Sequence, residues 1–173
     1  MTYVVFKGGL WPETTYVEAG EDRTMIESHD YVLHIEGTGP KNGVMTADED
    51  GLPALHVASP PEFGGPEAVW SPEHLFVAAV SSCLMTTFRT IAELSKLDVV
   101  SYSDDPVGHL IRDESGLYRI ESVTLRPRVT IADADKVVRA IRLIEKAERA
   151  CLVSRSVSAE IHLEPAVAVV EQV

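Results

Sequence analysis

The chain has 173 residues, of which 45% are hydrophobic and 24% charged, and its formal net charge is −12. That length suits one domain with a sizeable core, and the composition is neither that of a membrane protein nor that of a disordered one. A negative charge of this size disfavours nucleic acid as a partner, because it repels phosphates. The first residues lack the pattern of a signal peptide and the apolar runs are short of a bilayer span, so we expect a cytoplasmic protein without a membrane segment.

Cysteine and histidine content narrows the chemistry further. The chain has two cysteines, Cys83 and Cys151, and a reducing compartment argues against a standing structural disulfide between them. No cysteine pair has metal-ligand spacing, and the six histidines are scattered. We therefore expect no metal site, and nothing in the sequence implies an organic cofactor.

The beginning of the chain predicts one short strand and an arm. TYVVFK, residues 2–7, is a strand candidate, whereas residues 8–29 are rich in Gly, Pro, Glu and Asp and show little periodicity. Such a composition is typical of loops. We expect an N-terminal strand and extended arm over residues 1–30 and a single domain over residues 31–173.

The next part of the chain predicts a small antiparallel meander. Residues 31–37 alternate apolar and polar side chains like a half-buried strand, and the turn signal GTGPKNG follows at residues 37–43. Further strands are expected near VMTA, residues 44–47, and over residues 52–59. The Pro and Gly content of residues 60–70 then indicates a loop.

A long helix is predicted over residues 71–97. Ser71 is a favourable N-cap, Pro72 suits the first helical position, and Glu73 lies in the first turn, where a carboxylate favours the helix dipole. Residues 75–85 are apolar or small on every side of the helix. That pattern predicts a buried helix.

Two extended segments, residues 98–112 and 117–131, flank DESG and predict a hairpin. In the second segment the apolar side chains move from even to odd positions, which predicts a bulge near Glu121 or Ser122. Pro127 has no N–H group to donate, so it indicates an edge or bulge position.

Residues 133–151 predict an amphipathic helix that begins at an Asp cap, and residues 156–165 alternate as the last strand. The apolar positions of the helix share one face: Val137, Ala140, Ile141, Ile144, Ala147 and Cys151. Strands and helices that do not alternate strictly indicate the α+β class.

The two cysteines lie on the apolar faces of these two helices, so the helices can pack with the thiols facing each other. Ser81 and Ser82 place two hydroxyl groups in an otherwise apolar stretch of the helix, where packing alone does not require them. Cysteine is also a common small buried hydrophobe, and apolar surroundings alone leave a thiol inert. A reactive Cys83 therefore needs a cationic partner, and a packing role for both cysteines stays open.

Two stretches carry a family resemblance. In PPEFGGPEAVWSPEHLFVAAVSSCLMTTF, residues 60–88, a Pro-Glu helix start precedes the first cysteine by ten residues. In AERACLVSRSVSAEIHLEP, residues 147–165, the second cysteine is followed by x-Val-Ser. Together they resemble the OsmC/Ohr family, the osmotically inducible and organic hydroperoxide resistance proteins, over roughly residues 30–165.

The resemblance implies an intertwined homodimer with active sites at the interface, acting as a cytoplasmic thiol peroxidase on organic hydroperoxides. Cys83 corresponds to the peroxidatic thiol, which becomes a sulfenic acid, and Cys151 to the resolving thiol, which condenses with it to a disulfide. A dithiol, such as the dihydrolipoyl group of a lipoylated protein, then reduces the disulfide. Apolar surroundings at Cys83 favour alkyl or lipid hydroperoxides over hydrogen peroxide, with Trp70 and Phe76 as candidates for substrate contacts.

The family also uses a Glu and an Arg to orient the thiolate, and Glu73 matches that Glu. Ten helical residues place Glu73 about 15 Å along the axis from Cys83, so the two side chains cannot meet within one helix. A second copy that crosses at a two-fold axis can bring them together, and Glu73 is then expected to serve the partner's site. A helix-dipole role for Glu73 stays equally open.

This sequence departs from the family pattern at the position of the Arg. The corresponding turn carries Lys41, which supplies charge without the planar fork of a guanidinium, and Arg23 of the arm is another candidate. Lys41 as an ordinary solvated turn residue stays open. The departure keeps a second function possible, a non-catalytic dimeric protein that binds a small molecule in its interfacial pocket. Acyl transfer to Cys83 is a third and weaker alternative, because no Cys-His-Asp spacing is recognisable.

Overall fold

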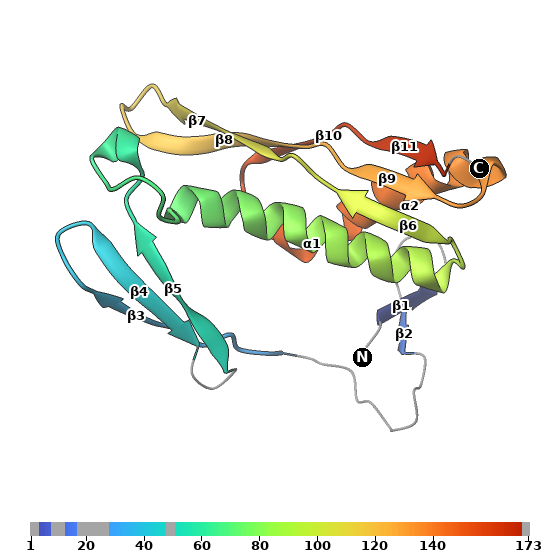
Figure 1. Ribbon diagram of the computed structural model, residues 1–173, viewed down its shortest axis with the longest axis horizontal. Coiled ribbons are helices and arrows are strands. Elements are labelled where there is room, and N and C mark those ends of the chain that lie inside the picture. Colours follow the sequence, from blue (N-terminus) through green and yellow to red (C-terminus); the bar gives the residue numbers. More distant parts are fainter. Residues whose placement is uncertain (1–3, 8–12, 17–27, 48–50, 171–173) are drawn as a thin grey trace. The chain divides into compact units, whose positions relative to one another are not determined.

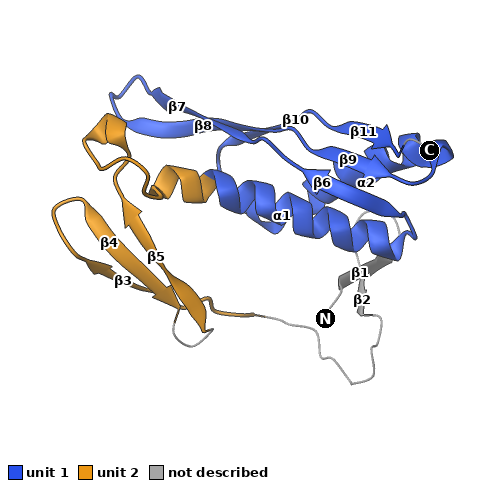
Figure 2. Cartoon of the chain, in the orientation of Figure 1, with its two compact units in different colours: residues 1–25, 77–173 blue, residues 26–76 orange. Residues whose placement is uncertain are grey.

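The computed structural model describes residues 4–7, 13–16, 28–47 and 51–170 (Figure 1). The chain forms two compact units, which Figure 2 colours separately. Unit 1 comprises residues 1–25 and 77–173, and unit 2 comprises residues 26–76. The expected division into an arm over residues 1–30 and a domain over residues 31–173 stays a prediction.

A two-stranded antiparallel hairpin lies near the N-terminus. β1 (Val4–Lys7) pairs with β2 (Glu13–Tyr16), and β1 agrees with the strand predicted over residues 2–7. The expectation of a loop is wrong for Glu13–Tyr16. Its Thr-Thr-Tyr sequence has high strand propensity, which the acidic, Gly-rich and Pro-rich neighbours obscured. The rest of the expected arm up to residue 27 lies outside the described residues.

Unit 2 contains the predicted antiparallel meander in the order β3-β4-β5, formed by β3 (His34–Gly37), β4 (Asn42–Ala47) and β5 (Leu52–Ala58). A short 3-10 helix, Pro61–Phe63, follows. The prediction that residues 31–37 are half buried is wrong, because every residue of β3 is exposed. Alternation of apolar and polar side chains shows which face a strand can bury. It does not show whether another element covers that face, and no described element covers β3.

Helix α1 (Pro72–Leu94) begins where the capping signals predict and ends three residues before the expected end. Its end is set by Lys96, whose φ of 52° is left-handed. The backbone N–H of Leu97 then donates to the Ala92 carbonyl, and that of Lys96 donates to the Glu93 carbonyl, both at 2.9 Å. This pair of bonds is a Schellman motif. Such a motif usually has glycine at the left-handed position, and because Lys96 stands there, the sequence does not signal the end of the helix.

The prediction that α1 is buried on every side is wrong for the single chain. One face is buried, at Val80, Leu84, Phe88, Ile91 and Ala92. The opposite face is exposed, at Ala78, Ala79, Ser82, Met85, Thr86 and Arg89. By length and composition alone α1 can cross a membrane. Its buried face instead packs within unit 1, where the Phe88 ring lies 5.9 Å from that of Tyr102.

The central strands of unit 1 form the predicted hairpin and bulge. β7 (Val107–Arg112) pairs antiparallel with β8 (Tyr118–Leu125). The register changes from His109 opposite Ser122 to Leu110 opposite Ile120, so Glu121 is the extra residue. This register shift confirms the bulge predicted near Glu121 or Ser122, and the extra residue accounts for the change of apolar phase along the strand.

Each predicted extended segment is divided into two strands. β6 (Val99–Ser103) precedes β7, and β9 (Arg128–Ile131) follows β8 and pairs antiparallel with β6. Pro127 lies in the break between β8 and β9, where no ladder hydrogen bond from its nitrogen is needed. Figure 1 shows these strands running side by side along α1.

The strand predicted over residues 156–165 is confirmed in part, because β10 (Glu160–Leu163) lies within that range. It is shorter than predicted, since helix α3 (Leu152–Ser156) ends at residue 156, and it is not the last strand, since β11 (Ala166–Val169) follows. β10 pairs parallel with β8 and β11 with β9, which gives the sheet orders β10-β8-β7 and β11-β9-β6. Pro165 lies between β10 and β11, and Pro127 lies between their pairing partners β8 and β9. Each of these two pairs of consecutive strands is therefore interrupted at a proline.

The second predicted helix is confirmed. α2 (Val137–Ala150) follows a 3-10 turn, Ala134–Lys136, whose cap Asp133 accepts a hydrogen bond from the Asp135 N–H. Its buried stripe is Ala140, Ile144, Ala147 and the adjoining Cys151. Together with the strands and α1, this helix confirms the α+β class, since the stripe packs into the same core as Val123, Leu125, Val129 and Ile131.

Candidate functional site

The structure brings the two cysteines together within unit 1. Cys83 lies on α1 and is half buried, whereas Cys151 follows α2 and is fully buried, with 0% of its surface exposed. Both are free thiols, and Cys83 lies close enough to Cys151 to raise its pKa. The expectation that the two helices bring the thiols together is therefore confirmed.

Cys151 lies at the junction of two helices. It ends α2 and is the residue before α3, with an extended backbone at φ −62° and ψ 117°. Burial raises the pKa of the Cys151 thiol, and the neighbouring Cys83 raises it further, while the hydroxyl and backbone N–H of Ser154 act in the opposite direction. Cys151 therefore rests as a protonated thiol with hydrogen-bond donors beside it.

Two buried hydroxyl groups near Cys151 have no hydrogen-bond partner in the described part of the chain, those of Tyr102 and Ser154. Burial raises the pKa of Tyr102 well above its ordinary value, and the carboxyl of Asp104 and the sulfur of Cys151 add to that effect. Tyr102 therefore stays a protonated phenol. Sequence reasoning missed both residues as site groups, although Ser154 stands in the Cys-x-Val-Ser motif.

One of the two helix hydroxyls noted in the sequence has a structural use. Ser81 donates a hydrogen bond of 2.6 Å to Asp104, whose other oxygen accepts the Arg126 backbone N–H at 2.7 Å. This bond holds α1 against the connection between β6 and β7 beside a pocket of about 320 Å3 that Tyr102 also lines. Ser82 points outward and bonds only to a carbonyl of its own helix.

The start of α1 carries a second group of polar and aromatic side chains, within unit 2. The Ser71 hydroxyl lies 2.8 Å from Nδ1 of His74, and the Trp70 ring lies 6.3 Å from the His74 ring, edge to face. Glu73 has one buried carboxylate oxygen without a hydrogen-bond partner among the described residues. Phe76 is half buried one turn further along the helix.

Lys41 is engaged within its own unit. Its ammonium donates a hydrogen bond to the Phe63 carbonyl in the 3-10 turn, close to Gly64. The structure therefore brings Cys83 and Cys151 together in unit 1, whereas Glu73, Lys41 and Trp70 belong to unit 2. Arg23, the other basic candidate, lies outside the described residues.

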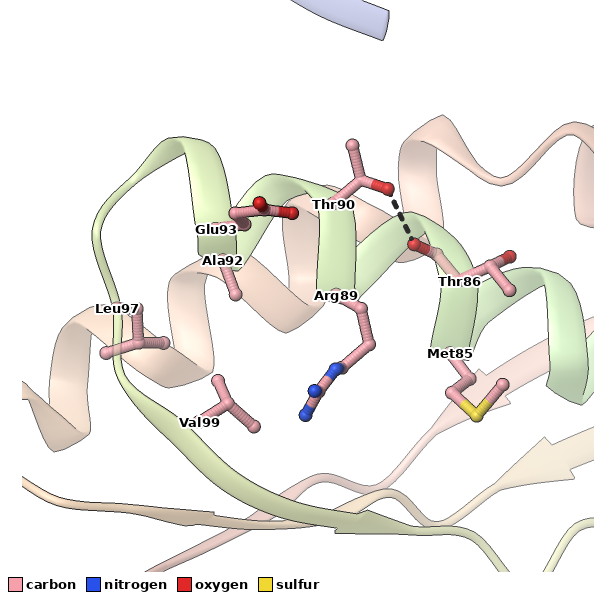
Figure 3. A pocket seen from close by; sticks show the side chains of 8 residues that line it. All are labelled: Met85, Thr86, Arg89, Thr90, Ala92, Glu93, Leu97 and Val99. Carbon is pink, nitrogen blue, oxygen red and sulfur yellow. Dashed lines mark hydrogen bonds between the residues drawn. The ribbon is translucent and has the colours of Figure 1, made fainter. Parts of the chain in front are cut away.

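The exposed side of α1 borders a pocket of about 520 Å3, which sequence reasoning did not predict. Its lining side chains come from α1 and the segment that follows it: Met85, Thr86, Arg89, Thr90, Ala92, Glu93, Leu97 and Val99. Figure 3 shows Arg89 extending from the helix into this space, while the Thr90 hydroxyl is bonded back to the Thr86 carbonyl at 3.0 Å. Neither cysteine lines it.

Comparison with known proteins agrees with this fold. The family model described as OsmC-like protein matches residues 65–166. The uncharacterized protein YmaD of Bacillus subtilis is 25% identical over 142 residues, which is 80% of this chain and 93% of that protein. Its printed name states no activity.

Two solved structures have similar folds. An OsmC-like protein of unknown function from Vibrio cholerae is 24% identical with a TM-score of 0.73, covering 80% of this chain and 99% of its own. An organic hydroperoxide resistance protein from Elizabethkingia anophelis is 22% identical with a TM-score of 0.64, covering 82% of this chain and 99% of its own. The family model spans more than half of the 173 residues and the fold agrees, so the chain belongs to the OsmC-like protein family.

Proposed function

We propose that this protein is a thiol-dependent peroxidase that reduces organic hydroperoxides. The observation that carries the proposal is the proximity of half-buried Cys83 to fully buried Cys151, both free thiols. Membership of the OsmC-like family supports it, as does the fold shared with an organic hydroperoxide resistance protein.

The difference in burial assigns the two roles. The Cys83 thiolate attacks the outer oxygen of R–O–O–H, the O–O bond breaks, Cys83 becomes a sulfenic acid, and the alkoxide leaves as the alcohol after taking a proton. Cys151 then attacks the oxidised sulfur, the S–O bond breaks, and water leaves as the disulfide forms. Cys151 suits the second step because burial raises its pKa and keeps it from competing for the peroxide.

The reduced state returns when an external dithiol, oxidised to its own disulfide, reduces the Cys83–Cys151 bond. A dihydrolipoyl group is our proposed reductant, and the cytoplasm, which keeps thiols reduced, is our proposed location. Apolar neighbours favour an alkyl hydroperoxide over hydrogen peroxide, with Trp70 and Phe76 as proposed substrate contacts. A rate ratio in favour of hydrogen peroxide would contradict that preference.

We further propose that the working form is a homodimer. The uncovered face of α1 and the wholly exposed β3 support this, since Ile35 of β3 is 64% exposed and Tyr31, which precedes the strand, is 83% exposed. Ten residues of helix separate Glu73 from Cys83, or about 15 Å along the axis. The unpartnered carboxylate oxygen of Glu73 therefore suits a thiol site on the other subunit.

Mixing two inactive proteins tests the shared site. Glu73→Gln and Cys83→Ser homodimers should each be inactive or nearly so, while each mixed dimer should recover about half of the wild-type turnover, because one of its two sites has both an intact Glu73 and an intact Cys83. A randomly assorted equal mixture should therefore recover about a quarter. Turnover of cumene hydroperoxide after unfolding and refolding the mixture is the measurement. Mixing two Cys83→Ser preparations is the control, and no recovery in the mixed dimer would place Glu73 outside the partner's site.

Intact mass tests the peroxidase itself. After one equivalent of cumene hydroperoxide, the reduced wild-type protein should lose two hydrogens, Cys151→Ser should gain one oxygen, and Cys83→Ser should keep its mass. These changes follow from a sulfenic acid at Cys83 that only Cys151 can resolve. An oxygen added to Cys83→Ser would reverse the roles.

An unchanged wild-type mass at neutral pH would favour the second candidate function, a dimeric protein that binds a small molecule without turning it over. The pocket of about 520 Å3 beside Arg89 supports that candidate, as does the engagement of Lys41 with a backbone carbonyl in place of a thiolate. Acyl transfer at Cys83 would instead show as a trapped thioester.

A further inference from the structure

Among the described residues, the neighbours that act on the Cys151 thiol are hydrogen-bond donors. They are Cys83 from α1 and Ser154 from α3, while Tyr102 of β6 lies near enough for the Cys151 sulfur to raise its pKa. No basic side chain is among the described groups that shift its pKa. A thiolate in a fully buried site is unfavourable unless neighbouring groups donate hydrogen bonds to it. Attack on an oxidised partner requires that thiolate, so some neighbour must donate.

Ser154 is placed for this task. It stands three residues after Cys151, in the short helix α3 that begins directly after the cysteine. Its hydroxyl is buried and has no hydrogen-bond partner among the described residues, which is unfavourable for a polar group. The hydroxyl and the backbone N–H of Ser154 lie close enough to the Cys151 sulfur to lower its pKa.

A second serine in the same helix shows the ordinary alternative. The hydroxyl of Ser156 donates a 2.8 Å hydrogen bond to the carbonyl of Leu152, four residues earlier. Serine hydroxyls in helices commonly donate a hydrogen bond to the backbone carbonyl four residues earlier. Ser154 makes no such bond. Tyr102 is not among the groups that shift the pKa of Cys151, whereas the charge of the Cys151 sulfur raises the pKa of Tyr102.

We infer that Ser154 is a positioning residue whose unpaired hydroxyl is held beside the Cys151 sulfur to donate a hydrogen bond to the thiolate that attacks oxidised Cys83. The inference rests on the proposed peroxidase function. In that step the Cys151 thiolate forms the S–S bond, the S–O bond of the Cys83 sulfenic acid breaks, and the leaving hydroxide takes the proton that Cys151 released. Ser154 keeps its own proton throughout.

Removing this hydroxyl should affect one step only. In Ser154→Ala the pKa of Cys151 should rise by about one unit, because a hydrogen bond to the charged form is lost. The thiolate fraction near pH 7 then falls about tenfold while its intrinsic nucleophilicity rises about threefold, so disulfide formation slows about threefold. Oxidation of Cys83 should keep its rate. The melting temperature should not fall, because the lost hydroxyl had no partner.

The titration uses the full chain labelled with 13C at the cysteine Cβ. Two cysteines give two NMR signals, and Cys151→Ser assigns them. We expect the Cys151 midpoint to move upward in Ser154→Ala and to stay in Ser154→Thr, which keeps a hydroxyl, and in Ser156→Ala, the matched control. Stopped-flow oxidation by cumene hydroperoxide from pH 6 to 10 then times disulfide formation, and the deficit of Ser154→Ala should shrink as pH rises.

Three outcomes would overturn the inference: an unmoved Cys151 midpoint in Ser154→Ala, a deficit of the same size at every pH, or failure of Ser154→Ala to fold. A different outcome concerns the proposed function. If hydroperoxide oxidises none of the proteins, the peroxidase proposal fails, whereas the NMR titration still decides whether Ser154 stabilises the Cys151 thiolate.

Discussion

Replacing Cys83 with serine should lower the turnover of cumene hydroperoxide, with dithiothreitol as reductant, by at least about a thousandfold. The hydroxyl of serine is not ionised at neutral pH and cannot be oxidised by a peroxide as a thiolate can. Cys83 is also the more accessible of the two thiols, since it is half buried while Cys151 is fully buried. A coupled assay of hydroperoxide consumption measures the loss.

Cys151→Ser should behave differently from Cys83→Ser. Its first equivalent of hydroperoxide should be consumed at the wild-type rate, because the attacking thiol is intact, while the Cys83 sulfenic acid accumulates and can be trapped with dimedone. Ser156→Ala, whose exposed hydroxyl bonds within α3, is the control for an unrelated serine change and should match the wild type. Turnover within tenfold of wild type in Cys83→Ser would remove Cys83 from the role of attacking thiol.

Phe88→Ala should lower the free energy of unfolding by about 3–5 kcal/mol. Phe88 has no exposed surface, lies at the centre of the buried face of α1, and packs its ring 5.9 Å from the ring of Tyr102. Truncation removes the transfer energy of the ring and leaves a cavity that the neighbouring side chains fill only in part. Because small domains have about 5–15 kcal/mol of stability, this loss is a large fraction of the total.

Urea denaturation followed by tryptophan fluorescence measures the effect. Val138→Ala is the matched control, since Val138 lies on α2 with 60% of its surface exposed and its truncation should cost under about 0.5 kcal/mol. Phe88→Ala should also loosen the contact between α1 and Tyr102, and with it the surroundings of Cys151. Equal losses from the two variants would show that α1 does not pack against β6 as described.

Features that depend on neighbouring residues were predictable from the sequence. The start of α1 follows from Ser71 and Pro72, because an N-cap and a first-turn proline act within one helical turn. The bulge at Glu121 follows from a change of apolar phase within one strand. The end of α1 was misplaced because Lys96 adopts a left-handed backbone that glycine would have signalled.

The errors in the strands have a tertiary cause. Residues 156–165 alternate like one strand, yet only Glu160–Leu163 forms β10, between the end of α3 and the break at Pro165, because β10 and β11 pair in parallel with β8 and β9. Pairing partners distant in sequence decide where such a strand starts and stops. The exposure of β3 has the same origin, since alternation shows what a strand can bury and not whether anything covers it.

By itself the sequence determined the α+β class, the order of most elements, the apolar stripe that ends at Cys151, and the resemblance that family membership then confirmed. Each of these follows from residue types and short spacings. Only the tertiary structure decided that the Cys83 and Cys151 thiols lie close together, that one face of α1 is uncovered, and that the buried Ser154 hydroxyl near Cys151 has no hydrogen-bond partner among the described residues. The physical reason is that contacts between side chains far apart in sequence depend on how helices and sheets pack, and periodicity along one segment carries no record of that packing.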